Sequence, residues 1–322
     1  MGKRIIVTGG AGFIGSNLVE ALLADERVDK VLVIDNLSNG YFSNIEEFEG
    51  HRNFEFVNED IRNAAKLVEL FKGYDLVSHQ AALGSVPRSI QDPITSNEVN
   101  VGGTLNVLNA AVKNNIKRVV LAFSSSTYGD SPILPKVEHT IGKPLSPYAV
   151  TKYACEVYAD VFQKVYGLDF IGLRYFNVFG PKQNPDNPYA AVIPLFCKSL
   201  LAGQQPKVNG DGETSRDFTY IANAIDANVK SLFSDNKNAL NEVYNVACGE
   251  RTSLNELVNY INQYLGADIS AIHGPERPGD VKHSLADISK AISLLNYNPS
   301  IKVIDGLKNV IDWYRSTEIS NN

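Results

Sequence analysis

Tyr148 and Lys152 are the residues whose types and spacing most directly suggest chemistry in this sequence. Residues four positions apart lie one turn from each other on the same face of a helix. A lysine ammonium beside a phenol stabilises the phenolate form. Tyr148 is therefore a candidate general base that removes a proton from a hydroxyl group. This spacing is also common on surface helices, so its weight depends on the rest of the chain.

A glycine-rich segment near the N-terminus supplies that context. Residues 3–8 predict a short apolar strand, which leads directly into Gly9, Gly12 and Gly15 and then into an amphipathic helix. Gly9 permits a tight turn, Gly12 lets a pyrophosphate approach the backbone, and Gly15 lets the helix pack close to the strand. The N–H groups at the start of the helix would face the phosphates. The segment therefore predicts a dinucleotide site.

The residue that ends the second expected strand indicates which dinucleotide binds. Asp35 follows the apolar run 30–34, twenty positions after Gly15. An acidic side chain there accepts hydrogen bonds from the adenosine ribose and repels a 2′-phosphate. We therefore expect NAD rather than NADP. The alternative is an ordinary glycine-rich connection followed by a turn residue, and the combined spacing and context favour NAD.

The order of the expected elements predicts an α/β fold. Further apolar runs predict strands at 53–57, 75–79, 117–123 and 169–174, with helices near 62–72, 97–114 and 147–166. Such alternation is typical of a doubly wound parallel sheet of the Rossmann type. Ligands of these sheets bind at the carboxyl ends of the strands, where the glycine segment, Asp35 and the serine run 124–126 all fall.

The character of the chain changes after about residue 178, where prolines become frequent. We predict an NAD-binding Rossmann domain over 1–177 and a smaller, mostly helical, substrate-binding subdomain over 178–322. Residues 242–246 resemble a strand that rejoins the main sheet, so the two parts would be interleaved.

Composition excludes several other classes of protein. The 322 residues carry a net charge of −6, which argues against nucleic acid or an anionic membrane as the main partner. We find no apolar run near the ~18 residues of a membrane span, and the first residues lead straight into a strand rather than a signal peptide. We therefore expect a cytoplasmic protein with reduced thiols at its three cysteines, and no metal site, because the five histidines form no cluster.

Seven short segments, in order along nearly the whole chain, make the sequence resemble a known family. They are residues 8–15, 60–62, 79–82, 100–104, 124–129, 146–152 and 173–177. The chain resembles the extended short-chain dehydrogenase/reductase family and, within it, the UDP-sugar 4-epimerases, most closely the bacterial UDP-N-acetylglucosamine 4-epimerases.

The resemblance assigns roles to residues of the first half. It implies Tyr148 as the base, with Lys152 as its electrostatic partner and nicotinamide-ribose ligand. One serine of the run 124–126 would hydrogen-bond the reacting hydroxyl, with Ser124 the first choice and Ser125 the second; the alternative is a strand end capped by its own backbone. The residues expected along NAD are Gly9, Gly12, Phe13, Ile14, Gly15, Asp35, Asn36, Asp60, Ile61, Ala81, Ala82, Asn100, Tyr148, Lys152 and Tyr175.

The second half must hold a nucleotide diphosphate. Arg216 and Arg277 each lie in an expected loop, where a guanidinium can grip phosphate oxygens bidentately. Isolated arginines more often form surface ion pairs, but the family pattern has both, with Asp280 on the uridine ribose and Asn177 on the diphosphate. The remaining residues expected around the sugar are Gly84, Ser85, Ser124, Ser125, Gln183, Ala191, Val192 and Ser284.

The reaction implied by the family is reversible oxidation at one carbon. A hydride passes from sugar C4 to tightly bound NAD while Tyr148 removes the O4 proton; the 4-keto sugar then turns over, and the hydride returns to its other face. NAD is thus recycled in place. Dehydratases of the family need an acidic pair after the strand-end Ser or Thr, and this chain has Ser125 and Ser126 there.

Ser284 suggests the sugar. Many hexose 4-epimerases carry a bulky tyrosine at this position, and a serine leaves room for an N-acetyl group. We therefore expect a UDP-N-acetylglucosamine/UDP-N-acetylgalactosamine 4-epimerase that supplies surface polysaccharide or lipopolysaccharide synthesis. The alternatives are a UDP-glucose/UDP-galactose or UDP-uronate 4-epimerase, a decarboxylase, or a non-catalytic NAD-sensing protein. By family analogy, segments 97–114 and 147–166 would pair two subunits in a homodimer.

Overall fold

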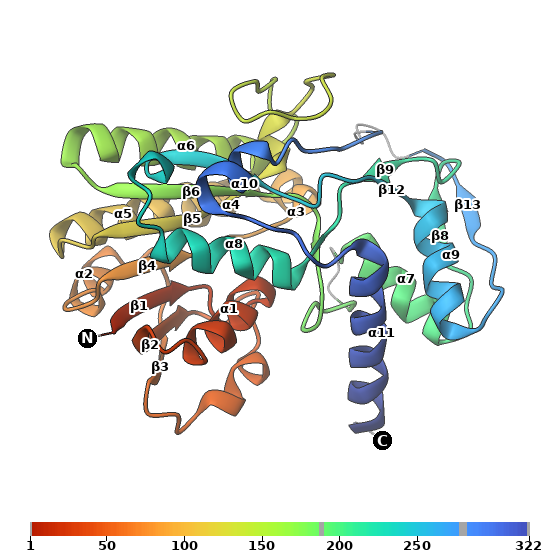
Figure 1. The fold of residues 1–322 in the computed structure, drawn as a ribbon, viewed down its shortest axis with the longest axis horizontal. Helices are drawn as coiled ribbons and strands as arrows, with labels where there is room; N and C mark the ends of the chain where they lie inside the picture. Colours follow the sequence, from red (N-terminus) through yellow and green to blue (C-terminus); the bar gives the residue numbers. More distant parts are fainter. Residues whose placement is uncertain (1, 187–189, 277–281, 321–322) are drawn as a thin grey trace.

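A seven-stranded parallel sheet forms the centre of the computed structural model, which describes residues 2–186, 190–276 and 282–320 (Figure 1). The strand order is β11-β6-β5-β4-β1-β2-β3. The chain winds from β1 outward to β3 and then returns to the other side of β1 with β4, so β1 and β4 flank the switch point where such sheets bind ligands. The strands are β1 Lys3–Thr8, β2 Val28–Asp35, β3 Phe54–Asn58, β4 Leu76–His79, β5 Arg118–Ser124, β6 Asp169–Tyr175 and β11 Glu242–Val246.

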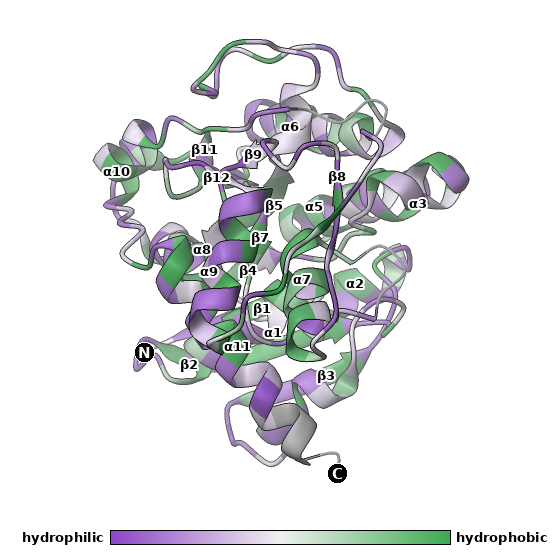
Figure 2. Ribbon diagram, turned by 90° about the vertical axis from the view of Figure 1, so that its right-hand side faces the viewer, coloured by the Kyte–Doolittle hydropathy of each residue, from purple (hydrophilic) through white to green (hydrophobic). Residues whose placement is uncertain are grey.

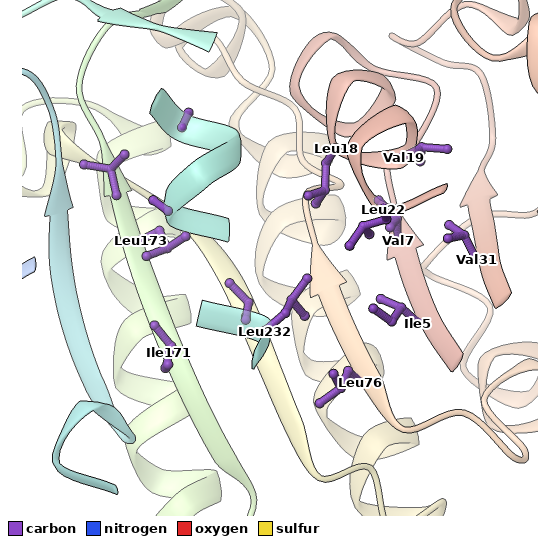
Figure 3. Packing of buried hydrophobic residues seen from close by; sticks show 14 of the residues in the cluster. Ile5, Val7, Leu18, Val19, Leu22, Val31, Leu76, Ile171, Leu173 and Leu232 are labelled. Carbon is purple, nitrogen blue, oxygen red and sulfur yellow. The ribbon is translucent and has the colours of Figure 1, made fainter. Parts of the chain in front are cut away.

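Helices cover both faces of this sheet because its strands are apolar on both sides. Ile5 and Val7 of β1 share one apolar cluster with Leu18 and Leu22 of α1 (Figure 3). Ile6, between them in the strand, belongs to the cluster on the opposite face. One face carries α1 Phe13–Leu23, α8 Ile221–Phe233 and α10 Ser289–Leu295, and the other carries α2 Ala64–Leu70, α5 Gly103–Lys113 and α6 Pro147–Tyr166.

The expected helix over 97–114 is divided rather than continuous. It consists of α4 Pro93–Asn97, a π-helical turn η3 Glu98–Gly102, and α5. The π-helical turn contains Asn100, whose side chain accepts a hydrogen bond from the Leu83 N–H (2.8 Å) and donates to Thr151 Oγ1 (3.0 Å). A π-bulge changes the direction of side chains within a helix, and here it accompanies tertiary hydrogen bonds that no helical periodicity reveals.

A smaller lobe lies beside the carboxyl ends of the strands (Figure 1). Phe179, Leu257 and Leu307 belong to its separate apolar core, and Figure 2 shows α7 largely green beside the more hydrophilic α9 and α11. The lobe contains α7 Val192–Leu201, α9 Leu254–Leu265, α11 Val303–Ser320 and three two-stranded pairs: β7 Val178–Phe179 with β10 Thr219–Tyr220, β9 Ser215–Arg216 with β12 Thr252–Ser253, and β8 Lys207–Asn209 with β13 Ile272–Gly274.

The two lobes are interleaved along the chain. Strand β11 pairs with β6 in the main sheet, and α8 and α10 pack on that sheet although all three follow residue 178. Within the described part of the chain, no helix is both long and apolar enough to cross a membrane.

Candidate active site

The glycine segment connects β1 to α1 at the switch point of the sheet. Gly9 has a φ of +71°, and a Cβ there would lie 2.6 Å from the Ala81 nitrogen; a Cβ on Gly15 would lie 2.1 Å from the Gly9 oxygen. Both positions therefore require glycine. Gly12 occupies the N-cap of α1 and supplies no side-chain cap, so the N-terminus of this helix presents backbone N–H groups to an anion.

Two carboxylates lie beside this segment. Asp35 is 8% exposed and accepts hydrogen bonds from the N–H groups of Ala11 (3.0 Å) and Leu37 (2.8 Å), while burial raises the pKa of its carboxyl group. Asp60 accepts hydrogen bonds from Arg62, which lowers the pKa of Asp60 to about 2. Asn36 donates to Asp60 over 2.8 Å. Ionised acids around this position disfavour an additional phosphate on the adenosine ribose.

A cavity of about 370 Å³, here called the glycine-loop cavity, extends from these residues to Tyr148. Every residue that we expected along the cofactor lines it except Asn100. These residues are Gly9, Gly12, Phe13, Ile14, Gly15, Asp35, Asn36, Asp60, Ile61, Ala81, Ala82, Tyr148, Lys152 and Tyr175.

Helix α6 positions the candidate base and its lysine. Ser146 caps the helix by accepting a hydrogen bond from the Ala149 N–H (3.2 Å), which places Tyr148 in the first turn. Lys152, one turn later, is 7% exposed; its Nζ donates to the Ala122 oxygen over 2.8 Å and lies 6.0 Å from the centroid of the Tyr148 ring. Tyr148 and Lys152 therefore face the same cavity, as the four-residue spacing predicts.

The helix is also fixed to the sheet at a buried ion pair. Glu156 of α6 accepts two hydrogen bonds from Arg174 of β6, over 2.9 and 2.7 Å. A bidentate arginine–carboxylate pair fixes both distance and orientation, so α6 cannot slide along β6 without breaking it. This pair lies one turn beyond Lys152 and limits the movement of the base.

The serine run begins at the carboxyl end of β5. Ser124 caps the short 3₁₀ helix η4 Ser125–Tyr128, and its Oγ accepts hydrogen bonds from the N–H (3.2 Å) and the hydroxyl (2.9 Å) of Ser126. Because Ser124 Oγ accepts both bonds, its own proton remains available to donate to a ligand oxygen. The capping role that we considered as an alternative is therefore present and compatible with ligand binding.

Two larger cavities continue from this point. The serine cavity, of about 730 Å³, is lined by residues including Ser124, Ser125, Ser126, Tyr175, Asn177, Arg216 and Ser284. The arginine cavity, of about 780 Å³, is lined by residues including Asn177, Ala191, Val192, Arg216 and Lys282. Tyr175 lines both the glycine-loop and the serine cavities, and Arg216 lines both the serine and the arginine cavities. The three cavities are thus adjacent parts of one cleft between the lobes.

Asp217 organises the arginine side of this cleft and was not anticipated from the sequence. It is fully buried and accepts hydrogen bonds from the backbone N–H groups of Cys248 (2.9 Å), Gly249 (3.1 Å) and Ala286 (3.1 Å). Burial raises its pKa to about 7, against the opposing effect of these three donors. Its backbone oxygen accepts a hydrogen bond from Asn177 (3.0 Å). In the sequence, the only signal for the structural role of Asp217 is its position directly after Arg216.

Six expected residues lie outside the cavity predicted for them or outside the described structure. Asn100 supports the backbone of Leu83, and Ser85 caps α3 Val86–Gln91 by accepting from the Arg88 N–H (3.2 Å), so neither lines the described walls of the three cavities. Gln183 and Gly84 line the glycine-loop cavity. Arg277 and Asp280 lie outside the described residues.

His79, beneath the glycine segment, is structural in this arrangement. Its ring nitrogens contact the hydroxyls of Thr8 (2.7 Å) and Thr104 (2.9 Å). Burial, reinforced by the charge of Lys152, lowers its pKa to about 3, so the ring is neutral at ordinary pH. Among the residues with described positions, no cluster of His, Cys, Asp or Glu side chains is arranged to hold a metal ion.

Comparison with known proteins assigns the family. Residues 5–247 match the model of the NAD dependent epimerase/dehydratase family. The chain belongs to this family. Its cofactor is NAD. The glycine segment, the N-terminus of α1 and Asp35 fit that dinucleotide.

Three relatives show how far the similarity extends. A solved UDP-N-acetylglucosamine 4-epimerase from Methanobrevibacter ruminantium, in complex with UDP-N-acetylmuramic acid, is 43% identical with a TM-score of 0.92, covering 98% of this chain and 99% of that one. A UDP-glucuronic acid 4-epimerase from Bacillus cereus, solved with UDP-glucuronic acid and NAD, is 33% identical with a TM-score of 0.90, covering 98% and 99%. A UDP-glucose 4-epimerase from Mycolicibacterium smegmatis is 36% identical over 316 residues, which are 97% of this chain and 99% of the relative.

Proposed function

We propose that this protein is an isomerase that interconverts UDP-N-acetylglucosamine and UDP-N-acetylgalactosamine at C4. The observation that carries the proposal is the junction at Tyr175, which lines both the glycine-loop cavity with Tyr148 and the serine cavity with Ser124. A sugar at this junction has a base on one side and a hydroxyl donor on the other. The relatives named above, which are 4-epimerases of UDP-sugars, support the proposal.

Each residue at the junction has a distinct role in the proposed reaction. Bound NAD supplies reversible hydride acceptance at the sugar C4. Tyr148 removes the O4 proton, with the Lys152 ammonium, 6.0 Å from the centroid of its ring, as its electrostatic partner. Ser124, whose oxygen already accepts from Ser126, donates a hydrogen bond to O4 without transferring its proton. After the 4-keto sugar has turned over within the cleft, the hydride would return to the other face of C4 and the same tyrosine returns the proton to O4, so no oxidised product leaves.

The serine run favours epimerisation over the dehydration known in the same family. Dehydration requires an acid and a base that act on the C5 and C6 side of the sugar. Ser125 and Ser126 occupy the positions after Ser124 in the serine cavity, and a hydroxyl of ordinary acidity serves in neither role. We therefore propose that the 4-keto sugar is reduced without loss of water.

The arginine cavity fits the UDP part of the substrate. Arg216 lines its wall, and Asn177 is held beside it by the hydrogen bond to the Asp217 backbone. In the adjoining serine cavity, which Arg216 also lines, Ser284 forms part of the wall and is only 9% exposed. A small side chain in the wall leaves volume for a 2-acetamido group, whereas a tyrosine there would fill it.

Purified protein incubated with UDP-N-acetylglucosamine, UDP-glucose and UDP-glucuronic acid, followed by separation of the C4 epimers, tests the proposal. We expect conversion of the acetylated sugar with the highest kcat/KM. A higher kcat/KM for the plain or the uronate sugar would contradict the assigned substrate and leave a UDP-glucose or UDP-uronate 4-epimerase in its place.

We further propose that the enzyme is a cytoplasmic homodimer that serves surface polysaccharide or lipopolysaccharide synthesis. The outer side of α6 exposes a row of apolar side chains at helical spacing, namely Val150 (54% exposed), Val157 (47%), Val161 (42%) and Val165 (64%). Burial of such a face against a second copy would remove this apolar area from water. Sedimentation of the wild-type chain and of Val157→Lys tests the dimer, which the variant is expected to weaken.

A further inference from the structure

Lys136 is a buried cation in the serine cavity that the proposed reaction does not use. It is 5% exposed, although lysine is among the residues least often buried. It lines the same cavity as Ser124 and Ser284. It comes from the loop 129–146 between η4 and α6, which protrudes at the top of Figure 1.

The backbone of Lys136 is fixed beside Ser284. Its N–H donates to the Leu285 oxygen over 2.7 Å, and its oxygen accepts from the Asp287 N–H over 2.9 Å. The Asn245 side chain donates to the same oxygen over 2.9 Å. These bonds join the loop directly to the segment after Ser284, so the two side chains form neighbouring parts of one cavity wall.

Within the described part of the chain, the Lys136 ammonium group has fewer hydrogen-bond acceptors than it has donors. Its Nζ donates to the Ser131 oxygen, and an ammonium carries three donors. Among the residues whose positions are described, no carboxylate forms an ion pair with Lys136, and burial lowers its pKa. A buried ammonium that lacks further acceptors is costly, so an acceptor oxygen supplied by a bound ligand would offset part of that cost.

We infer that Lys136 determines sugar specificity by donating a hydrogen bond to the acyl oxygen of the substituent at the sugar C2. Ser284 leaves the space for the acetamido group, and Lys136 supplies the donor that recognises it. The inference rests on the proposed function, because it names the group that distinguishes the acetylated sugar from plain UDP-glucose. A site built around a hydrogen bond discriminates against the analogue that lacks the acceptor more strongly than a merely roomy pocket does.

Substitution of Lys136→Met, which retains the length of the side chain without the donor, tests the inference. We expect kcat/KM for UDP-N-acetylglucosamine to fall about 10- to 100-fold, the size of a lost charge-assisted hydrogen bond, while kcat/KM for UDP-glucose changes less than about threefold. The ratio of the two constants is measured on one preparation, so a partly misfolded sample does not alter it. Lys143→Met, on an exposed lysine of the same loop, is the matched control and should leave the ratio unchanged.

Other outcomes separate the inference from the proposed function. An equal loss on both sugars would mean that Lys136 only supports the loop, and would overturn the inference while the function stands. A selective loss on UDP-glucuronic acid would show that Lys136 binds a carboxylate and would also overturn it. If the wild-type enzyme showed no preference for the acetylated sugar, the proposed substrate itself would fail.

Discussion

The glycine-loop cavity and the serine cavity meet at Tyr175 but are constructed differently. The part of the glycine-loop cavity that was recognised from spacing lies at the carboxyl ends of β1 and β2 and at the start of α1, within residues 9–44, and Tyr148, Lys152 and Tyr175 join it from later elements. The serine cavity combines segments near residues 86, 124, 136, 175, 216 and 284, which are remote in sequence. A site formed by consecutive elements can be recognised from spacing, whereas a site formed by distant loops depends on how those loops are joined.

The largest effect is expected where the two cavities meet. Tyr148→Phe removes the phenol and keeps the ring, so turnover should fall about 10²- to 10⁴-fold, the range of general acid–base catalysis. Binding of NAD and UDP, measured by calorimetry, should persist because neither depends on the hydroxyl. Unchanged turnover would show that another group removes the proton.

A Cβ in the glycine segment should weaken NAD binding and leave UDP binding unchanged. In Gly15→Ala the new carbon would lie 2.1 Å from the Gly9 oxygen, so the loop must shift, at a cost of about 1–3 kcal/mol. We expect NAD affinity, followed by fluorescence of bound NADH, to fall at least about tenfold, with UDP binding retained. Gly102→Ala, where a Cβ meets nothing within 4 Å, is the control. Equal NAD affinity in the two variants would refute the close packing of helix and strand.

In the serine cavity, the volume of the side chain at position 284 should determine kcat/KM for the acetylated sugar. Ser284→Tyr is expected to lower kcat/KM for UDP-N-acetylglucosamine about 10- to 100-fold and to leave UDP-glucose within a few fold, because the ring takes the space of the acetamido group. Ser293→Tyr on the exposed side of α10 controls for added bulk. If Ser284→Tyr processed the acetylated sugar undiminished, the size argument would be removed.

The smallest effect concerns the free energy of unfolding, to which His79 at the end of β4 contributes. The pKa of His79 is lowered from 6.5 to about 3 in the folded state, so between these values the unfolded chain binds a proton that the native one does not. His79 therefore lowers the free energy of unfolding as pH falls below about 6.5, by up to about 1.4 kcal/mol per pH unit. Other groups that titrate in this range, such as Asp217, contribute equally to both proteins, so urea unfolding of wild type and His79→Gln between pH 4.5 and 7 should show a free energy of unfolding that falls more steeply with decreasing pH in the wild type. Parallel profiles would mean that His79 titrates normally.

The same contrast explains what the sequence could predict. The glycine spacing and Asp35 predict a position for the NAD site because strand, turn and helix are consecutive. The apolar runs indicate the parallel sheet that the structure contains. The positions of Lys136 and Asp217 in the cleft could not be predicted from the sequence. Their hydrogen bonds join segments that are far apart in the chain, and hydrophobic periodicity does not reveal which such segments lie together. The π-helical turn at Asn100 was missed for a similar reason, since its side chain bonds Leu83 rather than its own helix.

Reaction in D₂O tests the central claim most directly, because it asks whether the two cavities together perform epimerisation at C4. UDP-N-acetylglucosamine is incubated with the enzyme, and the product is separated and analysed by mass and NMR. The account predicts the C4 epimer with no deuterium on any sugar carbon, since Tyr148 exchanges only the hydroxyl proton. Deuterium on carbon, or a 4-keto-6-deoxy product, would contradict it.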